Sequence, residues 1–112
     1  MAEITITKED DGRRGRYVAH VAGIDEEAEL TFTHRGTGLI SADHTGAPES
    51  MKGTGAAAAL VDFLIADARK AGFTIIPLCP YVRARYLKNP DWQEVMTVAP
   101  GVVPERPGRP QA

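Results

Sequence analysis

A short glycine-containing segment, Met51-Lys52-Gly53-Thr54-Gly55-Ala56, has the residue types best suited to binding a ligand. It lies between a predicted strand and a long predicted helix. Two glycines let backbone amide groups approach a ligand closely, and the start of a helix carries partial positive charge. The segment therefore predicts a cradle for phosphate groups. A tight turn that binds nothing is the alternative explanation of the same residues.

Two well-known phosphate loops can be compared with this segment. The mononucleotide pattern G-x-x-x-x-G-K-[ST] is absent. Residues 53–58 match G-x-G-x-x-A, but that dinucleotide motif also requires a parallel strand–helix–strand unit and an acidic residue about 20 positions further on. No Asp or Glu occurs between Asp67 and Asp91. The sequence therefore excludes a dinucleotide site of that kind.

The sequence gives little support for a metal site or for disulfide bonds. The chain has one cysteine, which excludes an internal disulfide framework and any Cys-rich zinc or iron–sulfur site. His20 and His34 lie on predicted strands and belong to no metal-ligand spacing. We therefore expect no metal.

The first half of the chain predicts four short antiparallel strands that would position the glycine segment. Apolar residues alternate with polar ones at Ile4 and Ile6, and the polar run at residues 9–12 predicts a turn. Further strands are predicted over residues 17–21, 28–34 and 39–44, with Arg35-Gly36-Thr37-Gly38 as the last turn. Short polar turns between strands are typical of an antiparallel meander.

The second half changes to a helical period. Over residues 54–71 the apolar positions recur at helical spacing, and Gly72 follows the basic pair Arg69-Lys70, as is typical of a helix end. A buried strand is predicted over residues 73–78 and a short helix over residues 81–88. The fold class predicted is α+β: a four-stranded meander, a long helix, a further central strand and a short C-terminal helix.

Composition limits the broader class. The 112 residues fit one domain, which we place at 1–97, followed by a Pro-rich tail at 98–112 that we expect to be disordered. The net charge of −2 argues against a nucleic-acid partner. Residues 52–88 nevertheless carry 6 basic and 2 acidic side chains, a local balance of +4 that suits an anion site. No secretory signal or stretch able to span a bilayer is visible, so we expect a cytoplasmic protein with no membrane partner.

Four stretches carry a likeness to a known family. They are His44-Thr45, then Lys52-Gly53-Thr54-Gly55 with Ala59-Leu60-Val61, then residues 76–82 (Ile-Pro-Leu-Cys-Pro-Tyr-Val), and then residues 86–92 (Tyr-Leu-Lys-Asn-Pro-Asp-Trp). Their order and spacing across residues 16–92 resemble the GNAT acetyltransferase superfamily, and specifically its compact single-domain branch of about one hundred residues.

The resemblance implies a site for acetyl-CoA as co-substrate. Its pyrophosphate would lie on the backbone of Lys52, Gly53, Thr54, Gly55 and Ala56. Its pantetheine arm would run between two splayed strands, pairing with the first of them near Thr45 and Ala47. Lys52, Arg83, Arg85 and Lys88 would be available to the phosphates, although surface cations are often only solvated.

The resemblance also implies catalytic candidates, each with a structural alternative. Tyr86, seven residues after Cys79, matches a tyrosine that often protonates the coenzyme sulfur, or it simply packs. Cys79 would accept the acetyl group as a nucleophile, or it is a small core residue. His44 is the remaining candidate base, or a structural strand residue.

Two positions depart from the family pattern. Ser50 stands where the superfamily has Gln or Arg, which removes one side-chain contact but not the backbone cradle. Gly46 stands where the compact branch favours an acidic residue, so no general base is available there. Trp92 is expected to pack against the sheet.

Two functions therefore remain open. The first is an acetyl-CoA-dependent N-acetyltransferase acting on a small-molecule or protein amine. The second is an acyl-CoA-binding module with little or no catalysis. We expect a monomer or weak dimer.

Overall fold

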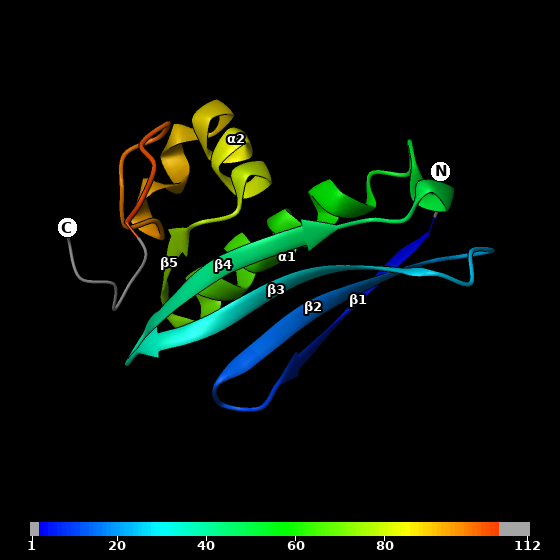
Figure 1. The fold of residues 1–112 in the computed structure, drawn as a ribbon, viewed down its shortest axis with the longest axis horizontal. Helices are drawn as coiled ribbons and strands as arrows, with labels where there is room; N and C mark the ends of the chain where they lie inside the picture. Colours follow the sequence, from blue (N-terminus) through cyan, green and yellow to red (C-terminus); the bar gives the residue numbers. More distant parts are fainter. Residues whose placement is uncertain (1–2, 106–112) are drawn as a thin grey trace.

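The computed structural model describes residues 3–105, which form a five-stranded sheet with one long helix on one face and a smaller helical segment near its last strand (Figure 1). Its elements, in chain order, are β1 (Ile4–Asp10), β2 (Arg14–Val21), β3 (Glu27–Gly36), β4 (Leu39–Gly46), the 3-10 turn η1 (Glu49–Met51), α1 (Ala56–Ala71), β5 (Thr74–Pro77), α2 (Pro80–Lys88) and the 3-10 turn η2 (Pro90–Glu94).

The sheet follows the order of the sequence, β1-β2-β3-β4-β5. The first four strands pair antiparallel, and β5 pairs with β4 in parallel. The parallel pairing is possible because α1 carries the chain back along the sheet before β5 begins. The α+β class and the four-stranded meander predicted from the sequence are therefore confirmed.

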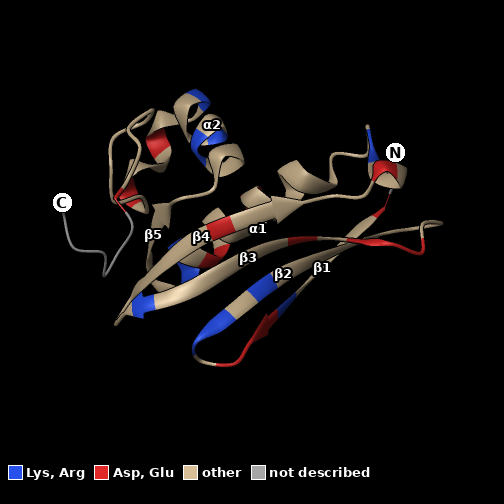
Figure 2. Cartoon of the chain, viewed as in Figure 1, with Lys and Arg blue, Asp and Glu red and all other residues tan. Residues whose placement is uncertain are grey.

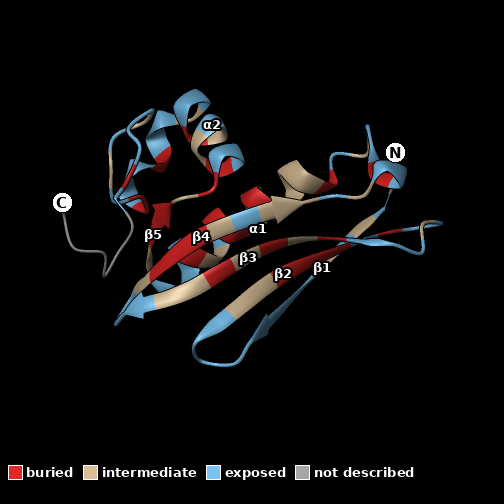
Figure 3. Cartoon of the chain, viewed as in Figure 1, coloured by how far each residue is buried: buried red, intermediate tan, exposed pale blue. Residues whose placement is uncertain are grey.

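The core lies between α1 and one face of the sheet (Figure 3). The apolar helix positions predicted to face it are all buried: Leu60, Val61, Leu64, Ile65 and Ala68. Alternate residues of the strands meet them, because side chains of a strand point to opposite faces in turn. In β3 the buried residues are Ala28, Leu30 and Phe32, so the residues between them lie on the opposite face. We call this the open face, since α1 does not cover it.

A partly buried polar contact joins the helix to the meander. The Tyr17 hydroxyl donates to Asp67 Oδ2 at 2.6 Å, and Lys8 Nζ lies 2.8 Å from the same carboxylate oxygen. Burial alone would raise the pKa of Asp67, but the hydrogen bonds from Lys8 and Tyr17 hold that pKa below its usual range. Burial and the neighbouring Asp67 carboxylate raise the pKa of Tyr17, which keeps this phenol a donor.

The structure corrects the place of one strand. The strand after the long helix was expected to be central, but β5 is last in the strand order. The segment after η2 lies along its outer edge, where Ile75 bridges Met96 in parallel and exchanges hydrogen bonds with Val95 and Thr97. These contacts depend on chain that comes about 20 residues later, which local periodicity cannot reveal.

Most other differences concern element ends. β1 runs on to Asp10 where a turn was expected, because Asp10 pairs with Gly15 of β2. The long helix begins at Ala56 rather than at residue 54, since Gly55 is its left-handed N-cap. Trp92 is buried in the main hydrophobic cluster, as expected of a packing residue.

The C-terminal segment is described only in part. Residues 98–105 run past α2, with the side chain of Pro104 buried and Val103 exposed. The remainder of the predicted tail, residues 106–112, lies outside the described residues. No helix within residues 3–105 has the length and apolar character needed to cross a membrane.

Candidate functional site

The glycine segment forms a turn with an unusual backbone. Gly53 and Gly55 have φ values of 81° and 83°, in the left-handed region that favours glycine. Between them, the Thr54 hydroxyl donates to the Met51 carbonyl at 2.7 Å and accepts the Ala56 amide at 3.2 Å. The segment is therefore held by its own hydrogen bonds before any ligand arrives.

The start of α1 leaves donors available beside this turn. The Ala59 amide bonds to the Gly55 carbonyl at 2.9 Å, so the amides of Ala57 and Ala58 precede the first complete turn of the helix. Such first-turn amides have no partner within their own helix and carry the positive end of its dipole. Anions bind favourably at this kind of terminus.

A cavity of about 290 Å³ lies over the turn. Its walls come from the chain after β4, from the turn and from both helices; they include Ala47, Lys52, Gly53, Gly55, Ala56, Ala57, Ala58 and Tyr81. Five residues predicted to contact the cofactor thus share one cavity. Of the other predicted binders, Thr54 lies in the turn itself and supports it from within. Tyr81 was not among the residues predicted to bind the cofactor. Its position in the Cys-Pro-Tyr stretch is the only sequence signal that indicates it.

The second part of the site is the end of β4. β5 pairs with Leu39–Ala42 only, and the Cys79 amide then donates to the Ala42 carbonyl at 2.8 Å. Beyond that bond the chain turns into α2, so in the described structure Asp43–Gly46 have no partner in β5, and His44–Gly46 pair with β3 alone. The two strands thus part at Cys79, and the free edge of β4 leads toward the glycine turn.

The Cys79 thiol lies at this parting. Its side chain is buried, and Cys79 Sγ is 3.3 Å from the Thr45 hydroxyl oxygen, within hydrogen-bond distance. Thr45, a predicted binding residue, therefore contacts the predicted nucleophile. Two placements were thus predicted from the sequence alone: a cysteine where the strands part, and Thr45 on the adjoining strand.

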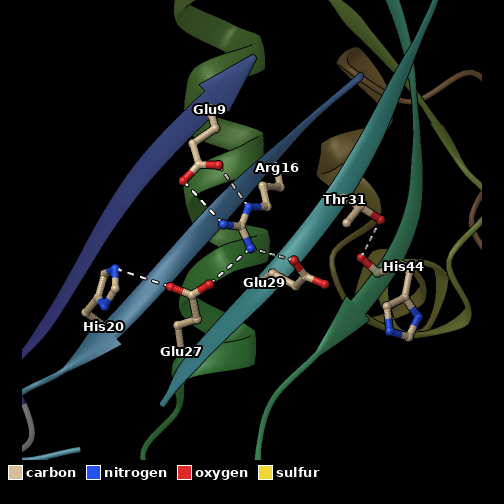
Figure 4. Close-up of polar contacts among 7 residues, drawn as sticks. All are labelled: Glu9, Arg16, His20, Glu27, Glu29, Thr31 and His44. Carbon is tan, nitrogen blue, oxygen red and sulfur yellow. Dashed lines mark hydrogen bonds and ion pairs between the residues drawn. The ribbon is translucent and has the colours of Figure 1, made fainter. Parts of the chain in front are cut away.

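His44 lies on the open face of β4, opposite to the face that carries Thr45. It is exposed and sits opposite Thr31, whose hydroxyl donates to the His44 carbonyl (Figure 4). A Cβ built at Gly46 would stand 3.1 Å from His44 Nε2, so the missing side chain at Gly46 leaves room for this imidazole. Neighbouring strand residues alternate in direction, which separates His44 from Cys79 and Thr45.

Tyr86 makes a different contact from the one its spacing implied. It is fully buried, and its hydroxyl donates to the Val98 carbonyl at 2.7 Å. Burial raises the pKa of this phenol. Within residues 3–105 no hydrogen bond joins any two of Cys79, His44 and Tyr86. The three predicted catalytic residues are therefore not a preassembled triad.

The basic residues of the +4 segment have unequal roles. Lys52 lines the cavity over the turn. Arg85 Nη2 is 3.2 Å from Asp62 Oδ1 of α1, and its guanidinium lies over the Trp92 ring, so Arg85 fixes α2 to the fold. Lys88 is at the far end of α2, about 12 Å along the axis from the end that carries Tyr81. Figure 2 shows the basic residues of α2 as blue parts of the helix ribbon.

One residue that sequence reasoning missed is Asp43. It is an extra residue in β4: Thr31 pairs with His44 and Phe32 with Ala42, which leaves Asp43 unpaired in a bulge.

Among the described residues, no group of three His, Cys, Asp or Glu side chains is arranged to hold a metal ion.

Comparison with known proteins agrees with this arrangement. The model of the family described as GCN5-related N-acetyl-transferase matches residues 16–95, more than half of the chain. No curated protein matches the chain.

Proposed function

The chain belongs to the GCN5-related N-acetyltransferase family, and we propose that it is an acetyl-CoA-dependent N-acetyltransferase with an amine acceptor. A domain of this family supports acyl transfer in general. The finer proposal depends above all on one observation: the cavity over the glycine turn adjoins the free edge of β4, which leads to Cys79. A long ligand with phosphates at one end and a thioester at the other suits that path.

The phosphate end has suitable partners in this chain. Two left-handed glycines shape the turn, and first-turn amides of α1 and the Lys52 ammonium supply positive charge. A pyrophosphate carries negative charge and many acceptor oxygens, which such donors bind well. The space beside both glycines is open, since a Cβ built at Gly53 or Gly55 would meet nothing within 4 Å. The residues present therefore fit the group.

The pantetheine arm would lie along Asp43–Gly46, whose outer edge no strand occupies in the described structure. An extended chain with amide groups can bond to such an edge as an added strand does. Acetyl-CoA supplies an acetyl thioester at the end of this arm. Thr45 and Cys79 stand where the arm would end, and we propose that they position the thioester.

Acetyl transfer to an amine needs three events. The ammonium must lose a proton, the thioester oxygen must be stabilised, and the departing thiolate must be protonated. Cys79 and Tyr86 were the sequence-based candidates for acyl acceptor and acid, and His44 for the base. Since the Tyr86 hydroxyl donates to Val98 and His44 lies on the opposite face of β4 from Thr45, we keep Cys79 as the residue to test first.

An acyl-CoA-binding module with little catalysis is the second candidate. It is favoured by the burial of Cys79, whose thiol contacts a threonine rather than a base, and by the engaged hydroxyl of Tyr86. Such a module needs the cradle and the β4 edge but no acid or base.

One experiment separates the two candidates. The protein is incubated with acetyl-CoA and a panel of primary amines, and released coenzyme A and acetylated amine are measured. We expect both products in equal amounts. Tight acetyl-CoA binding without acetylation of any amine would favour the binding module. Intact mass without added amine shows whether Cys79 carries acetyl, with Cys79→Ala as the control.

A further inference from the structure

A cavity of about 780 Å³ lies on the open face of the sheet, away from the glycine turn. It runs from the β1–β2 turn, where Asp11 and Arg14 line it, across Thr31 and Thr33 to Asp43 in β4. Gly15 and Phe32 also line it. The meander thus has a hollow that the proposed coenzyme site does not use.

Asp43 is held at the inner end of this cavity. Its carboxylate accepts hydrogen bonds from the Thr33 hydroxyl at 2.5 Å and from the Ser41 hydroxyl at 2.7 Å. Ser41 is fully buried and accepts the Arg35 Nε–H at 2.9 Å. The nearest cation, Arg35 Nη2, remains 3.8 Å from the carboxylate, beyond hydrogen-bond distance. The carboxylate is therefore fixed in place, and its ion pair with Arg35 includes no direct hydrogen bond.

The bulge brings this carboxylate to the junction of two cavities. Asp43 and Arg35 also line a second cavity of about 490 Å³, whose other walls include Leu78, Pro80 and Arg83. Leu78 and Pro80 flank Cys79, where β4 and β5 part. The open-face cavity therefore shares Asp43 and Arg35 with a second cavity that is lined by the two neighbours of Cys79.

The charged residues that line the cavity have a net charge of −1, because four carboxylates face three arginines: Glu9, Asp10, Asp11 and Asp43 against Arg14, Arg16 and Arg35. Arg16 is surrounded by Glu9, Glu27 and Glu29, with closest N–O distances of 2.9–3.1 Å (Figure 4). Three carboxylates exceed the single charge of Arg16, and these contacts raise its pKa further above its already high value. In Figure 4 this cluster lies in front of the sheet with α1 behind it, so its surplus negative charge acts on the open face.

We propose that the open-face cavity binds the acetyl acceptor, and that the acceptor is a cationic primary amine whose ammonium group sits against Asp43. The shared chemistry is an unbranched alkylammonium with further positive charge near it, as in a linear polyamine or in a lysine side chain of a basic peptide. The inference rests on the proposed function, because only an acetyltransferase would use this ligand as an acceptor.

In the transfer, the ammonium first loses a proton to solvent. Its nitrogen then forms a bond to the acetyl carbon as the C–S bond breaks. The nitrogen releases its second proton and the departing thiolate takes up one, so an acetamide and free coenzyme A result.

The test measures binding separately from catalysis. Backbone amide signals of the protein saturated with coenzyme A are followed by NMR during titration with spermidine and, separately, with a short basic peptide containing one lysine. We expect signals of Thr33, Ser41 and Asp43 to shift. Asp43→Asn should weaken amine binding roughly tenfold or more, the usual effect of losing a charged hydrogen-bond partner.

Two further variants make the test specific. Glu27→Gln removes the same charge from the same face but outside the cavity, and should weaken amine binding far less than Asp43→Asn does. Arg35→Gln removes the cation nearest Asp43, and should bind them at least as tightly. Thermal unfolding checks that each variant is folded.

The outcomes are distinct. Shifts confined to other signals, equal weakening in Asp43→Asn and Glu27→Gln, or weakening in Arg35→Gln like that in Asp43→Asn would overturn the inference. Different measurements test the proposed function. It fails if coenzyme A causes no signal shifts at Lys52–Ala56 or if no acetylated product forms. Comparing spermidine with the peptide, and each with an acidic peptide of equal length, identifies the source of the amine.

Discussion

The two glycines at the ends of α1 give a sharp test of the phosphate cradle. Gly55 is the N-cap with φ 83° and Gly72 is the C-cap with φ 81°, and a Cβ at either would meet nothing within 4 Å. Only the left-handed backbone conformation therefore disfavours alanine at these two positions. A left-handed conformation costs a residue with a Cβ about 1–2 kcal/mol.

The two variants should have the same effect on folding and different effects on binding. Gly55→Ala and Gly72→Ala should each lower the unfolding free energy by about 1 kcal/mol, or about 4–8 °C in Tm for a domain near this size. The methyl group of Gly55→Ala also stands in the open space beside the turn, where we place the phosphates. Coenzyme A affinity should therefore fall roughly 5- to 30-fold, the equivalent of losing about 1–2 kcal/mol of binding free energy.

Isothermal titration with coenzyme A, beside thermal unfolding, measures both effects. Gly72→Ala is the matched control, since it lies at the opposite end of the same helix and should bind coenzyme A as the wild type does. Equal loss of affinity in both variants would show that stability, not the cradle, controls binding. Unchanged affinity in a destabilised Gly55→Ala would refute the phosphate assignment.

Three other predictions concern the thiol and the core. After incubation with acetyl-CoA, any acetyl group found on the wild-type chain by intact mass should be absent from Cys79→Ala; an equally acetylated variant would contradict the role of that thiol. Asp67→Asn should lower the unfolding free energy by about 1–3 kcal/mol at pH 7, because the Tyr17 hydroxyl loses a charged acceptor. Since the folded pKa of Asp67 is lowered, this contribution is complete above its unfolded pKa of about 3.9 and is lost as pH falls through the folded value. A difference between the two proteins that grows below pH 4 would refute it. Gly15→Ala should destabilise by about 1–3 kcal/mol, since its Cβ would overlap the Phe32 ring, and denaturant unfolding that shows no loss would contradict this packing.

The order of elements could be predicted from the sequence because each has a local cause. The spacing of Leu60, Leu64 and Ala68 defines α1, and Gly72 ends it with a left-handed cap. The four strands of the meander follow from period-two alternation and short polar turns. Their ends were less certain, since β1 extends to Asp10 only because β2 offers it a partner.

The finer features of the site depend on contacts between distant segments. The bulge at Asp43 exists only relative to β3, so no pattern within β4 reveals it. The position of β5 depends on the later segment that carries Met96. The Tyr86 hydroxyl donates a hydrogen bond to the Val98 carbonyl, and the spacing between Cys79 and Tyr86 gives no indication of this partner. Local sequence therefore predicted the glycine turn and the position of Cys79, while tertiary packing determined which polar groups meet.

The central claim is that this fold brings acetyl-CoA, held at the glycine turn, to an amine at the parting of β4 and β5. The most direct measurement follows the acetylated product and free coenzyme A by mass spectrometry during incubation with acetyl-CoA and a cationic primary amine. We expect the two products to form in equal amounts, and more slowly in Gly55→Ala than in Gly72→Ala at subsaturating acetyl-CoA. A protein that binds acetyl-CoA yet forms no acetylated amine would contradict the claim.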